Sequence, residues 1–351
     1  MRIILILRLM KLKMQNKKIF SCLLLLSFLI VLSGCKKEFS FYDNLFVLDT
    51  VMSIRIGNDN AYHSDEVVKK VLSEIKRLDK IFNVHNSGSE AYRLNQKAYH
   101  QEVPVSAELL ECIQLALHFA GLSGGAFDPT LLPLKKIWNF TGNSLKAVPN
   151  KSQIQSALKN IGYQNIRISE NRIRFLKKDL ALDLGGIAKG YIIDKVVALL
   201  KAEGVRNALI NIGGDVFALG NKIKEKWKIG IQHPRDNDKL VSLLAAQNVA
   251  VVTSGDYERF AIINGKRYHH IINPSTGYPA DGCISVSVIA DKAVTADALS
   301  TTFFVLGVEK SFELVKKLSH VEFQIVAIRN GDLKIRQTQG FKRYSTPINP
   351  N

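Results

Sequence analysis

The chain has 351 residues, of which 46% are hydrophobic and 23% charged, and its formal net charge is +17 at pH 7. This is ordinary globular composition, and the length suffices for one large domain or two smaller ones with a real core. An excess of basic over acidic residues favours binding to nucleic acid, to anionic lipid or to an anionic small substrate. The sequence contains no run of Lys and Arg interleaved with aromatic residues that would indicate a nucleic-acid module. We therefore expect no nucleic-acid partner.

Residues 1–34 have the form of a signal peptide. An uncharged apolar run over 19–32 follows six basic residues, which are Arg2, Arg8, Lys11, Lys13, Lys17 and Lys18. This run is shorter than the about 20 residues that span a bilayer, so a permanent transmembrane helix is the weaker interpretation. Because the leader contains no acidic residue, its removal leaves a net charge of +11 on the mature chain.

The leader ends in Leu32-Ser33-Gly34-Cys35, which resembles the lipobox of bacterial lipoproteins, where cleavage leaves the cysteine as an acylated N-terminus. The resemblance implies lipidation of Cys35, for example with palmitate, and a lipidated tether over 35–41. We expect the protein in the cell envelope, anchored by lipid to the extracytoplasmic side of a bacterial membrane. Inner and outer membrane both stay open. The alternative is a soluble secreted protein in which Cys35 is incidental.

Hydrophobic periodicity predicts the secondary structure in chain order. Alternation over 45–56 predicts a first strand, Ser64 opens a helix that reaches Phe82, and Ser106 opens a helix that Gly124 and Gly125 end. Further helices are predicted at 150–161, about 188–202, 296–305 and 309–318. A hairpin is predicted at 166–168 and 173–175, and strands at 208–212, 227–231, 249–253, 269–272 and 284–289.

This order of elements shows no strict strand–helix alternation, no internal repeat and no linker rich in Pro, Gly or Ser. We therefore predict a single layered domain over 42–346, of α+β or α/β class, with a mixed, partly antiparallel sheet and flanking helices. Cys112 lies on an apolar helix face and Cys283 in a predicted strand. Two buried free thiols are therefore expected in place of a disulfide framework.

The most informative stretch is Leu182-Asp183-Leu184-Gly185-Gly186-Ile187-Ala188-Lys189-Gly190-Tyr191. A strand that turns through two glycines into a helix can form a phosphate site, because glycines let the backbone approach a phosphate and the helix N-terminus aims free N–H groups at it. Lys189 adds a positive charge in the first turn. The spacing matches neither the dinucleotide fingerprint nor the P-loop, so this stretch alone fits an ordinary tight turn equally well.

Four further stretches combine special backbone residues with polar side chains. They are Asn211-Ile212-Gly213-Gly214-Asp215, Thr253-Ser254-Gly255-Asp256-Tyr257-Glu258-Arg259, His269-His270-Ile271-Ile272-Asn273-Pro274-Ser275-Thr276-Gly277-Tyr278-Pro279 and Val294-Thr295-Ala296-Asp297-Ala298-Leu299-Ser300-Thr301. Pro274 and Gly277 predict a rigid loop. Asp297 and Thr301 stand four apart on a predicted helix and share one face, where a carboxylate and a hydroxyl can hold a hard cation.

In this order, and over about half of the chain, the five stretches resemble the FAD:protein FMN transferase family, also called ApbE-type flavin transferases. The resemblance implies FAD as substrate and Mg²⁺ as cofactor, with Mn²⁺ as the alternative metal. The implied metal ligands are Asp297, Thr301 and the backbone carbonyl of Gly186. The implied FAD contacts are Met52, Ala126, Phe127, Asp128, Asp183, Lys189, His270 and Ile271. At His85 family members often carry a tyrosine or tryptophan, so the resemblance does not extend to a stacking contact there.

Each implied site residue also has a structural alternative when it is taken singly. Asp297 would be an exposed helix acid, His270 a structural histidine and Asp183 a helix cap. Met52 and Phe127 would be core residues.

The implied activity is magnesium-dependent transfer of FMN from FAD to a threonine or serine hydroxyl of an acceptor protein, with release of AMP. The family's acceptors are exported or membrane redox subunits. The predicted catalytic residues are Lys189, which would stabilise phosphate charge, and Asp297 or His270, one of which would take the hydroxyl proton. The alternatives are a magnesium-dependent FAD pyrophosphatase that gives FMN and AMP, and a flavin-binding lipoprotein without turnover.

Overall fold

The computed structural model describes residues 38–58, 61–140, 145, 147–329 and 332–346. The predicted signal peptide and Cys35 lie outside the described residues. In the described ranges, no helix has the length and apolar character that crossing a membrane requires.

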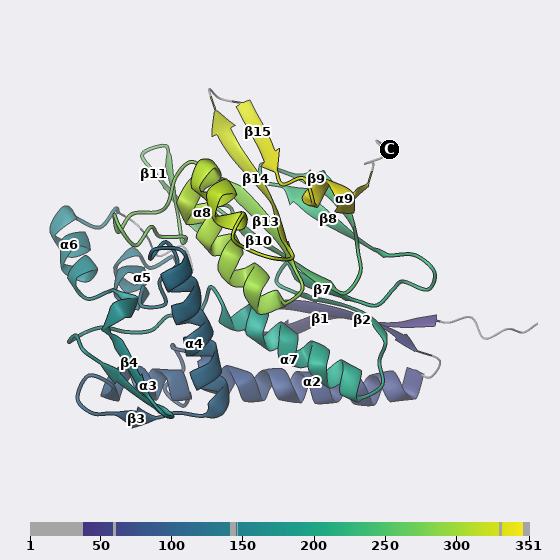
Figure 1. Ribbon diagram of the computed structural model, residues 1–351, viewed down its shortest axis with the longest axis horizontal. Coiled ribbons are helices and arrows are strands. Elements are labelled where there is room, and N and C mark those ends of the chain that lie inside the picture. The colour runs from purple at the N-terminus through teal and green to yellow at the C-terminus, as the bar shows by residue number, and fades with distance from the viewer. Residues whose placement is uncertain (1–37, 59–60, 141–144, 146, 330–331, 347–351) are drawn as a thin grey trace, which may run out of the picture. The chain divides into compact units, whose positions relative to one another are not determined.

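An eight-stranded sheet forms the middle layer of the protein (Figure 1). Its strand order is β1-β2-β6-β7-β10-β13-β14-β15, and the neighbouring strands from β2 to β15 all pair antiparallel. The strands are β1 (Glu38–Val47), β2 (Thr50–Asn58), β6 (Asn207–Ile212), β7 (Asp215–Leu219), β10 (Val249–Gly255), β13 (Ser285–Ala290), β14 (Val321–Arg329) and β15 (Asp332–Gln337). The predicted layered class with flanking helices is confirmed.

Helices cover one face of this sheet and a second sheet covers the other. The helical layer consists of α2 (Ala61–Phe82), α7 (Ala188–Ala202) and α8 (Ala293–Val315), with α7 between the other two (Figure 1). The opposite layer is the sheet β16-β9-β8, made of β8 (Trp227–His233), β9 (Asp236–Ala246) and β16 (Ser345–Thr346), next to α9 (Phe341–Tyr344).

Strand β10 is buried on both of its faces. Ala250 and Val252 pack in the core shared with the helices, whereas Val249 and Val251 pack in a cluster with Trp227 of the second sheet. A strand that is covered on both faces reads as a continuous apolar run instead of an alternating one. This explains the sequence of β10 and places its carboxyl end, Thr253–Gly255, firmly within the molecule.

A smaller region of helices and short strands lies beside the helical layer (Figure 1). It contains α3 (Glu90–Lys97), α4 (Ala107–Leu122), α5 (Leu132–Trp138), α6 (Lys151–Lys159) and the 3-10 turn η1 (Tyr163–Asn165), with the small sheet of β3 (Val103–Pro104), β5 (Arg172–Phe175) and β4 (Ile166–Ser169). The two-stranded sheet of β11 (Phe260–Ile263) and β12 (Lys266–His269) follows β10 in the chain.

Trp138 at the end of α5 ties this region to the predicted rigid loop. Its side chain is fully buried and stacks on Tyr268, and its Nε1 donates a hydrogen bond of 2.7 Å to the backbone oxygen of Gly277. Gly277 has φ of 74° and lies so close to Ile154 that a side chain would clash there. The loop therefore depends on glycine at this position.

Several predicted elements begin or end where the sequence indicates. The hydroxyl of Ser106 accepts a hydrogen bond from the backbone N–H of Leu109 and opens α4, and Asn150 forms a capping box with Gln153 at the start of α6. Helix α7 spans 188–202 as predicted, and β4 and β5 form the predicted hairpin. Cys112 and Cys283 are buried and free, as expected, and burial raises the pKa of the Cys283 thiol to about 12.

Near the N-terminal part of the domain, three predictions are wrong. The alternation over 45–56 contains two strands, because Leu48 and Asp49 form a two-residue turn with φ of 51° and 57°, and such a turn preserves the alternation on both sides. Strand β1 already begins at Glu38, so residues 38–41 belong to the sheet and not to a tether. Helix α2 begins at Ala61, which puts Ser64 inside the helix, fully buried, and not at its cap.

The C-terminal half gives one confirmation and one difference. The helices predicted at 296–305 and 309–318 correspond to two helical segments within α8, which meet at a kink where Gly307 has a non-helical φ of 76°. Strand β12 ends at His269, so residues 270–272 belong to a loop and not to the predicted strand over 269–272.

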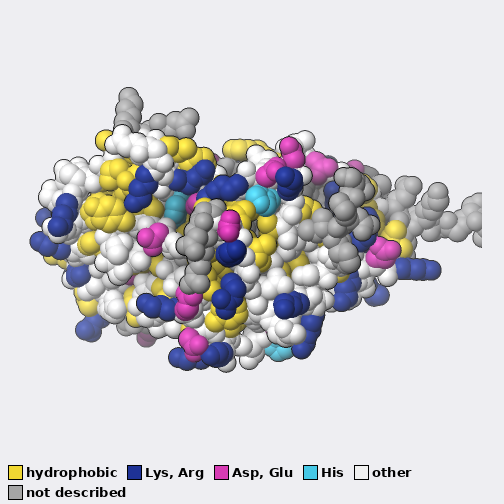
Figure 2. Space-filling model, turned by 90° about the horizontal axis from the view of Figure 1, so that it is seen from above, with side chains coloured by type: hydrophobic (Ala, Val, Ile, Leu, Met, Phe, Trp, Pro, Cys, Tyr) yellow, Lys and Arg dark blue, Asp and Glu magenta, His cyan; other side chains and the backbone are white. Residues whose placement is uncertain are grey.

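The basic excess of the chain is spread over the surface that Figure 2 shows. On this face, Lys and Arg side chains are interspersed with Asp, Glu and apolar side chains. Charges of mixed sign at an exposed surface are well solvated and produce no large field of one sign. The expectation that no nucleic acid binds stays a prediction.

Candidate active site

A cavity of about 400 Å³ brings together segments that are far apart in the sequence. Its lining includes every predicted site residue except Met52 and Cys35, namely Ala126, Phe127, Asp128, Asp183, Gly186, Lys189, His270, Ile271, Asp297 and Thr301. The structure also places His85, Lys135, Asp215, Ser254, Glu258 and Arg259 in the lining. Cys35 lies outside the described residues.

Met52 does not reach the cavity. It lies in β2 opposite Ile212 of β6, and its side chain is fully buried in the core. The β1–β2 turn just before it, with Leu48, Asp49 and Thr50, lines the cavity instead. The contact of Met52 with the substrate stays a prediction.

The glycine turn before α7 is held by side chains instead of by a regular strand. Leu182 donates its N–H to Oδ1 of Asn95 at 2.7 Å and accepts a hydrogen bond from Nδ2 of Asn95 at 3.0 Å, so one amide side chain replaces a neighbouring strand. Only an isolated bridge between Leu131 and Ala181 precedes it. The predicted strand is thus absent from this described segment, while the glycine turn and the helix that follows are present.

Asp183 is bound within the turn by both of its oxygens. Oδ1 accepts the N–H of Gly185 at 2.7 Å, and Oδ2 forms an ion pair of 2.7 Å with Nζ of Lys135. Burial alone would raise the pKa of this carboxyl, but Lys135 and the Gly185 amide stabilise its charged form and leave the pKa below its usual value.

Gly186 and Gly190 bring α7 close to α8. A Cβ on Gly186 would lie 3.4 Å from Oγ1 of Thr301, and a Cβ on Gly190 would clash with the backbone oxygen of Ala293 and lie 2.8 Å from Cβ of Asp297. The N–H of Gly190 donates to Oδ2 of Asp297 at 2.8 Å. Gly190 is therefore required for the close approach of the two helices at the cavity, and at Gly186 there is little room for a side chain.

The N-terminus of α8 is fixed by a side chain of α7. Asp194 accepts the backbone N–H groups of Ala293 and Val294 at 2.8 Å and 3.0 Å. A carboxylate at this position satisfies free amides of the first turn and interacts favourably with the helix dipole. This contact sets the position of Asp297 one turn further along.

Two buried carboxylates share one lysine at the floor of the cavity. Asp215, which follows the Gly213-Gly214 turn, forms an ion pair of 2.8 Å with Nζ of Lys189. Asp297 is 5% exposed, and burial together with the negative charge of Asp215 raises its pKa to about 7, although Lys189 opposes this. The cluster carries more negative than positive charge in a desolvated place, which favours a bound cation.

The residues present fit a hard divalent cation. Asp297 offers a carboxylate, Thr301 a hydroxyl and Gly186 a backbone carbonyl, all oxygen donors of the kind that Mg²⁺ prefers. No group of three or more His, Cys, Asp or Glu side chains that could hold a metal occurs among the described residues. The donor set is thus one of mixed oxygen types, with the hydroxyl of Ser254 3.5 Å from Oγ1 of Thr301.

The two neighbouring histidines differ in their surroundings. Nε2 of His269 lies 2.8 Å from the backbone oxygen of Ala280, and Nδ1 accepts the N–H of Ile271, so His269 supports the loop. His270 lines the cavity, and its buried Nδ1 has no hydrogen-bond partner among the described residues. Burial, and then the positive charges of Lys135 and Arg259, lower the pKa of His270 to about 3.

The predicted nucleotide segment is a compact turn in the wall of the cavity. Oδ1 of Asp128 accepts the N–H of Thr130 at 2.8 Å and its hydroxyl at 2.6 Å, and Oδ2 accepts the N–H of Tyr163. Phe127 is 4% exposed and faces Gly186. Asp128 therefore shapes the wall, and Phe127 is a nearly buried part of the same wall.

Sequence reasoning did not assign a role to Lys135 or Asp215. Asp215 stands in a glycine-rich stretch that was recognised, and its position directly after a strand and two glycines was a usable signal. Lys135 stands in α5, a helix that periodicity did not predict, so nothing in the local sequence points to it.

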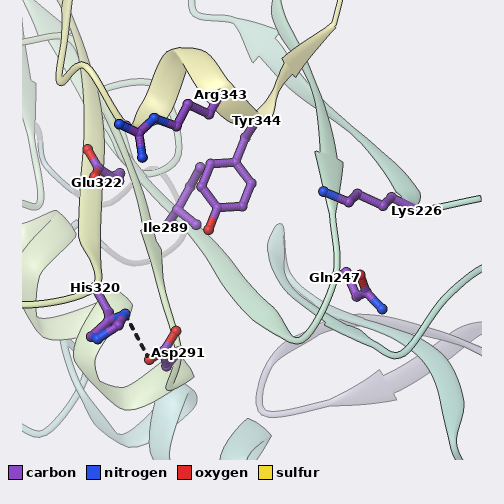
Figure 3. A pocket seen from close by; sticks show the side chains of 9 residues that line it. Lys226, Gln247, Ile289, Asp291, His320, Glu322, Arg343 and Tyr344 are labelled. Atoms are coloured by element: carbon purple, nitrogen blue, oxygen red, sulfur yellow. Dashed lines mark ion pairs between the residues drawn. The ribbon is translucent and has the colours of Figure 1, made fainter.

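A second hollow of about 410 Å³ lies elsewhere on the protein (Figure 3). Its wall contains Lys226, Asp291, Glu322, Arg343 and Tyr344, with an ion pair of 3.8 Å between His320 and Asp291. The two hollows have similar volumes, so size does not distinguish them. No predicted site residue lies in the second one, and its charged groups are mostly exposed, whereas the first contains the buried carboxylates of Asp128, Asp183, Asp215 and Asp297.

Comparisons with known proteins point to one family. The sequence profile of the ApbE family matches residues 48–325. Proteins named FAD:protein FMN transferase from Treponema pallidum and Klebsiella pneumoniae are each 34% identical to this chain. The first covers 79% of this chain and 81% of its own length, the second 79% and 87%.

Solved structures show the same fold. The ApbE protein of Thermotoga maritima has a TM-score of 0.81 and 34% identity, covering 88% of this chain and 100% of its own. The flavin transferase ApbE of Vibrio cholerae has a TM-score of 0.80 and 26% identity, covering 88% and 99%. With its profile match, its relatives and its fold in agreement, the chain belongs to the ApbE family.

Proposed function

We propose that this protein transfers the FMN half of FAD to a threonine or serine hydroxyl of an acceptor protein and releases AMP. The observation that carries the proposal is the cavity, in which a glycine turn, two lysines and an oxygen-donor cluster surround one space. This combination suits a pyrophosphate with a bound divalent cation. The names of the relatives agree with flavin transfer.

In the proposed reaction the acceptor oxygen attacks the phosphorus of the FMN half. A new P–O bond forms between the acceptor and FMN, the P–O bond to the AMP phosphate breaks, and AMP leaves with the electron pair of that bond. Mg²⁺, held by Asp297, Thr301 and the carbonyl of Gly186, would neutralise phosphate charge when bound. Lys189 stabilises the same charge from the first turn of α7.

The hydroxyl proton needs a base, and we propose His270. Its buried Nδ1 has no hydrogen-bond partner among the described residues, so it can accept a proton in the tautomer that carries hydrogen on Nε2, whereas Oδ2 of Asp297 is already occupied by the N–H of Gly190. The pKa of about 3 applies without substrate. A bound pyrophosphate would offset the positive charges of Lys135 and Arg259, and the pKa of His270 would rise toward the range of a useful base.

The test is mass spectrometry of an acceptor incubated with FAD, Mg²⁺ and the leaderless protein. The acceptor is the FMN-free, threonine-bearing domain of an exported redox subunit. We expect a mass gain equal to FMN, and Asp297→Ala should slow labelling by about 10²-fold or more. The matched control is Asp238→Ala, because Asp238 is an exposed aspartate outside the cavity.

Three outcomes separate the candidate functions. Labelling that depends on Asp297 supports the transferase. Consumption of FAD to free FMN and AMP with an unmodified acceptor would favour the pyrophosphatase. FAD that binds and stays intact would favour a flavin-binding lipoprotein without turnover.

We further propose that a lipid on Cys35 anchors the protein to the extracytoplasmic side of a bacterial membrane, near acceptors that are membrane redox subunits. The support is the lipobox-like sequence Leu32-Ser33-Gly34-Cys35. In cell fractionation, the wild-type chain should sediment with membranes and Cys35→Ser should not. Equal membrane association of both would contradict the anchor.

A further inference from the structure

Lys135 occupies a central place in the cavity that no motif assigned to it. It stands in α5, its side chain lines the cavity and is 32% exposed, and its Nζ lies 2.7 Å from Oδ2 of Asp183. A Cβ on Gly185 would lie 3.5 Å from the same Nζ. The ammonium group is therefore held directly at the glycine turn.

Within this ion pair, the lysine is the half that remains available to a ligand. Asp183 is 7% exposed, and its two oxygens are bound to Lys135 and to the N–H of Gly185. An ammonium group has three protons, and the contact with Asp183 uses one of them. A buried carboxylate would also repel a phosphate, so Asp183 is better suited to hold Lys135 than to contact the substrate.

A lysine and the proposed metal ligands lie at successive residues of the glycine turn. Lys135 lies at Gly185, the oxygen donor Thr301 lies at Gly186, and Lys189 follows in the first turn of α7 with 30% of its side chain exposed. One end of the turn is thus occupied by a lysine and the other by the proposed metal ligands. A pyrophosphate placed along the turn would have a cation at each phosphoryl group.

We propose that Lys135 is a substrate-binding residue whose ammonium group binds a phosphoryl oxygen of the dinucleotide pyrophosphate, with Asp183 as its positioning partner. This inference rests on the proposed function, since it takes FAD as the substrate. The proposal places the second lysine–aspartate pair, Lys189 and Asp215, on the opposite side of the pyrophosphate.

The test is equilibrium binding of FAD in the presence of Mg²⁺, measured by quenching of flavin fluorescence. Lys135→Gln should weaken FAD binding about tenfold or more, because a charge-assisted hydrogen bond is lost. Lys135→Arg should keep most of the affinity. The matched control is Lys136→Gln, because Lys136 is the next residue of the same helix, is exposed and lies outside the cavity lining.

Three smaller probes show whether the effect acts on phosphate. Riboflavin, which has no phosphate, should bind wild type and Lys135→Gln alike. Either AMP or FMN has its phosphoryl group at Lys135, and that ligand should bind Lys135→Gln more weakly than it binds the wild type. The double variant Lys135→Gln with Asp183→Asn removes both charges, so no buried carboxylate is left unpaired to repel the phosphate, and it should still bind FAD more weakly than the wild type because the ammonium group is gone.

Unchanged FAD affinity in Lys135→Gln and in the double variant would overturn the inference, as would an equal loss for riboflavin and FAD. These results leave the proposed function intact, because the wild type still binds FAD. If the wild type itself binds no FAD with Mg²⁺, the proposed function fails and this inference fails with it.

Discussion

Two lysines at the cavity are each held by an aspartate. Lys135 is paired with Asp183 and Lys189 with Asp215, whereas Asp297 has only the N–H of Gly190 and a pKa raised to about 7. A carboxyl group whose pKa is raised by burial and by a neighbouring negative charge is typical of a functional site. The unbalanced charge lies where the proposed metal ligands meet.

Part of this arrangement could be predicted from the sequence and part could not. Asp297 and Thr301 are four residues apart, so helical periodicity alone places them on one face. The ion pair of Lys135 and Asp183 joins residues 48 positions apart and needs the tertiary fold. The burial of Met52 and the local hydrogen bonds of Asp128 could not be predicted for the same reason, and their contacts with a substrate stay predictions.

The low pKa of His270 gives a pH dependence of stability. His270 has a pKa of about 3 in the folded protein and about 6.5 when unfolded, so between these values the unfolded chain binds more protons. The free energy of unfolding therefore falls on acidification from about pH 6.5 toward pH 3. His270→Gln should lose less thermal stability between pH 7 and pH 5 than the wild type does.

Thermal melting of both proteins at several pH values measures this difference. Comparing the two melts cancels the buried carboxylates whose raised pKa values act in the opposite direction, such as Asp194 and Asp128. Parallel curves for the two proteins would show that His270 is protonated equally in both states.

The contact between α7 and α8 is the element-scale feature on which the site depends. Gly186 and Gly190 allow the approach, and Asp194 of α7 holds the first amides of α8. The bounds of α7 followed from the sequence because its apolar periodicity is clear, and so did the break within α8, where Gly307 takes a non-helical conformation between two helical segments. Strands β7, β9, β14 and β15 were missed, since pairing with neighbours far along the chain determines them.

Gly190→Ala should disrupt this contact. The new methyl group would clash with the backbone oxygen of Ala293, so the free energy of unfolding should fall by about 1–3 kcal/mol and metal-dependent FAD binding should weaken. Chemical denaturation and FAD titration measure the two effects.

Gly121→Ala is the matched control for that substitution. Gly121 stands near the end of α4 with open space around it, so alanine there should leave stability unchanged or raise it by up to about 1 kcal/mol. If Gly190→Ala behaved like this control, close helix packing would not explain the glycine.

On the scale of the whole molecule, three layers position the cavity. The central sheet is covered by helices on one face and by the sheet β16-β9-β8 on the other, and the smaller region with α3 to α6 contributes Phe127 and Lys135 from one side. The sequence predicted the layered class, because strands and helices are mixed without strict alternation. It could not predict the strand order, which places β10 at the middle of the sheet.

The central claim is that a protein hydroxyl, and not water, receives the FMN. The most direct measurement is the stoichiometry of one incubation of the leaderless protein with FAD, Mg²⁺ and acceptor, with AMP and free FMN quantified by chromatography and bound FMN by mass spectrometry. The account predicts one AMP released for each FMN bound to the acceptor, with little free FMN. AMP matched by free FMN, with the acceptor unlabelled, would contradict it.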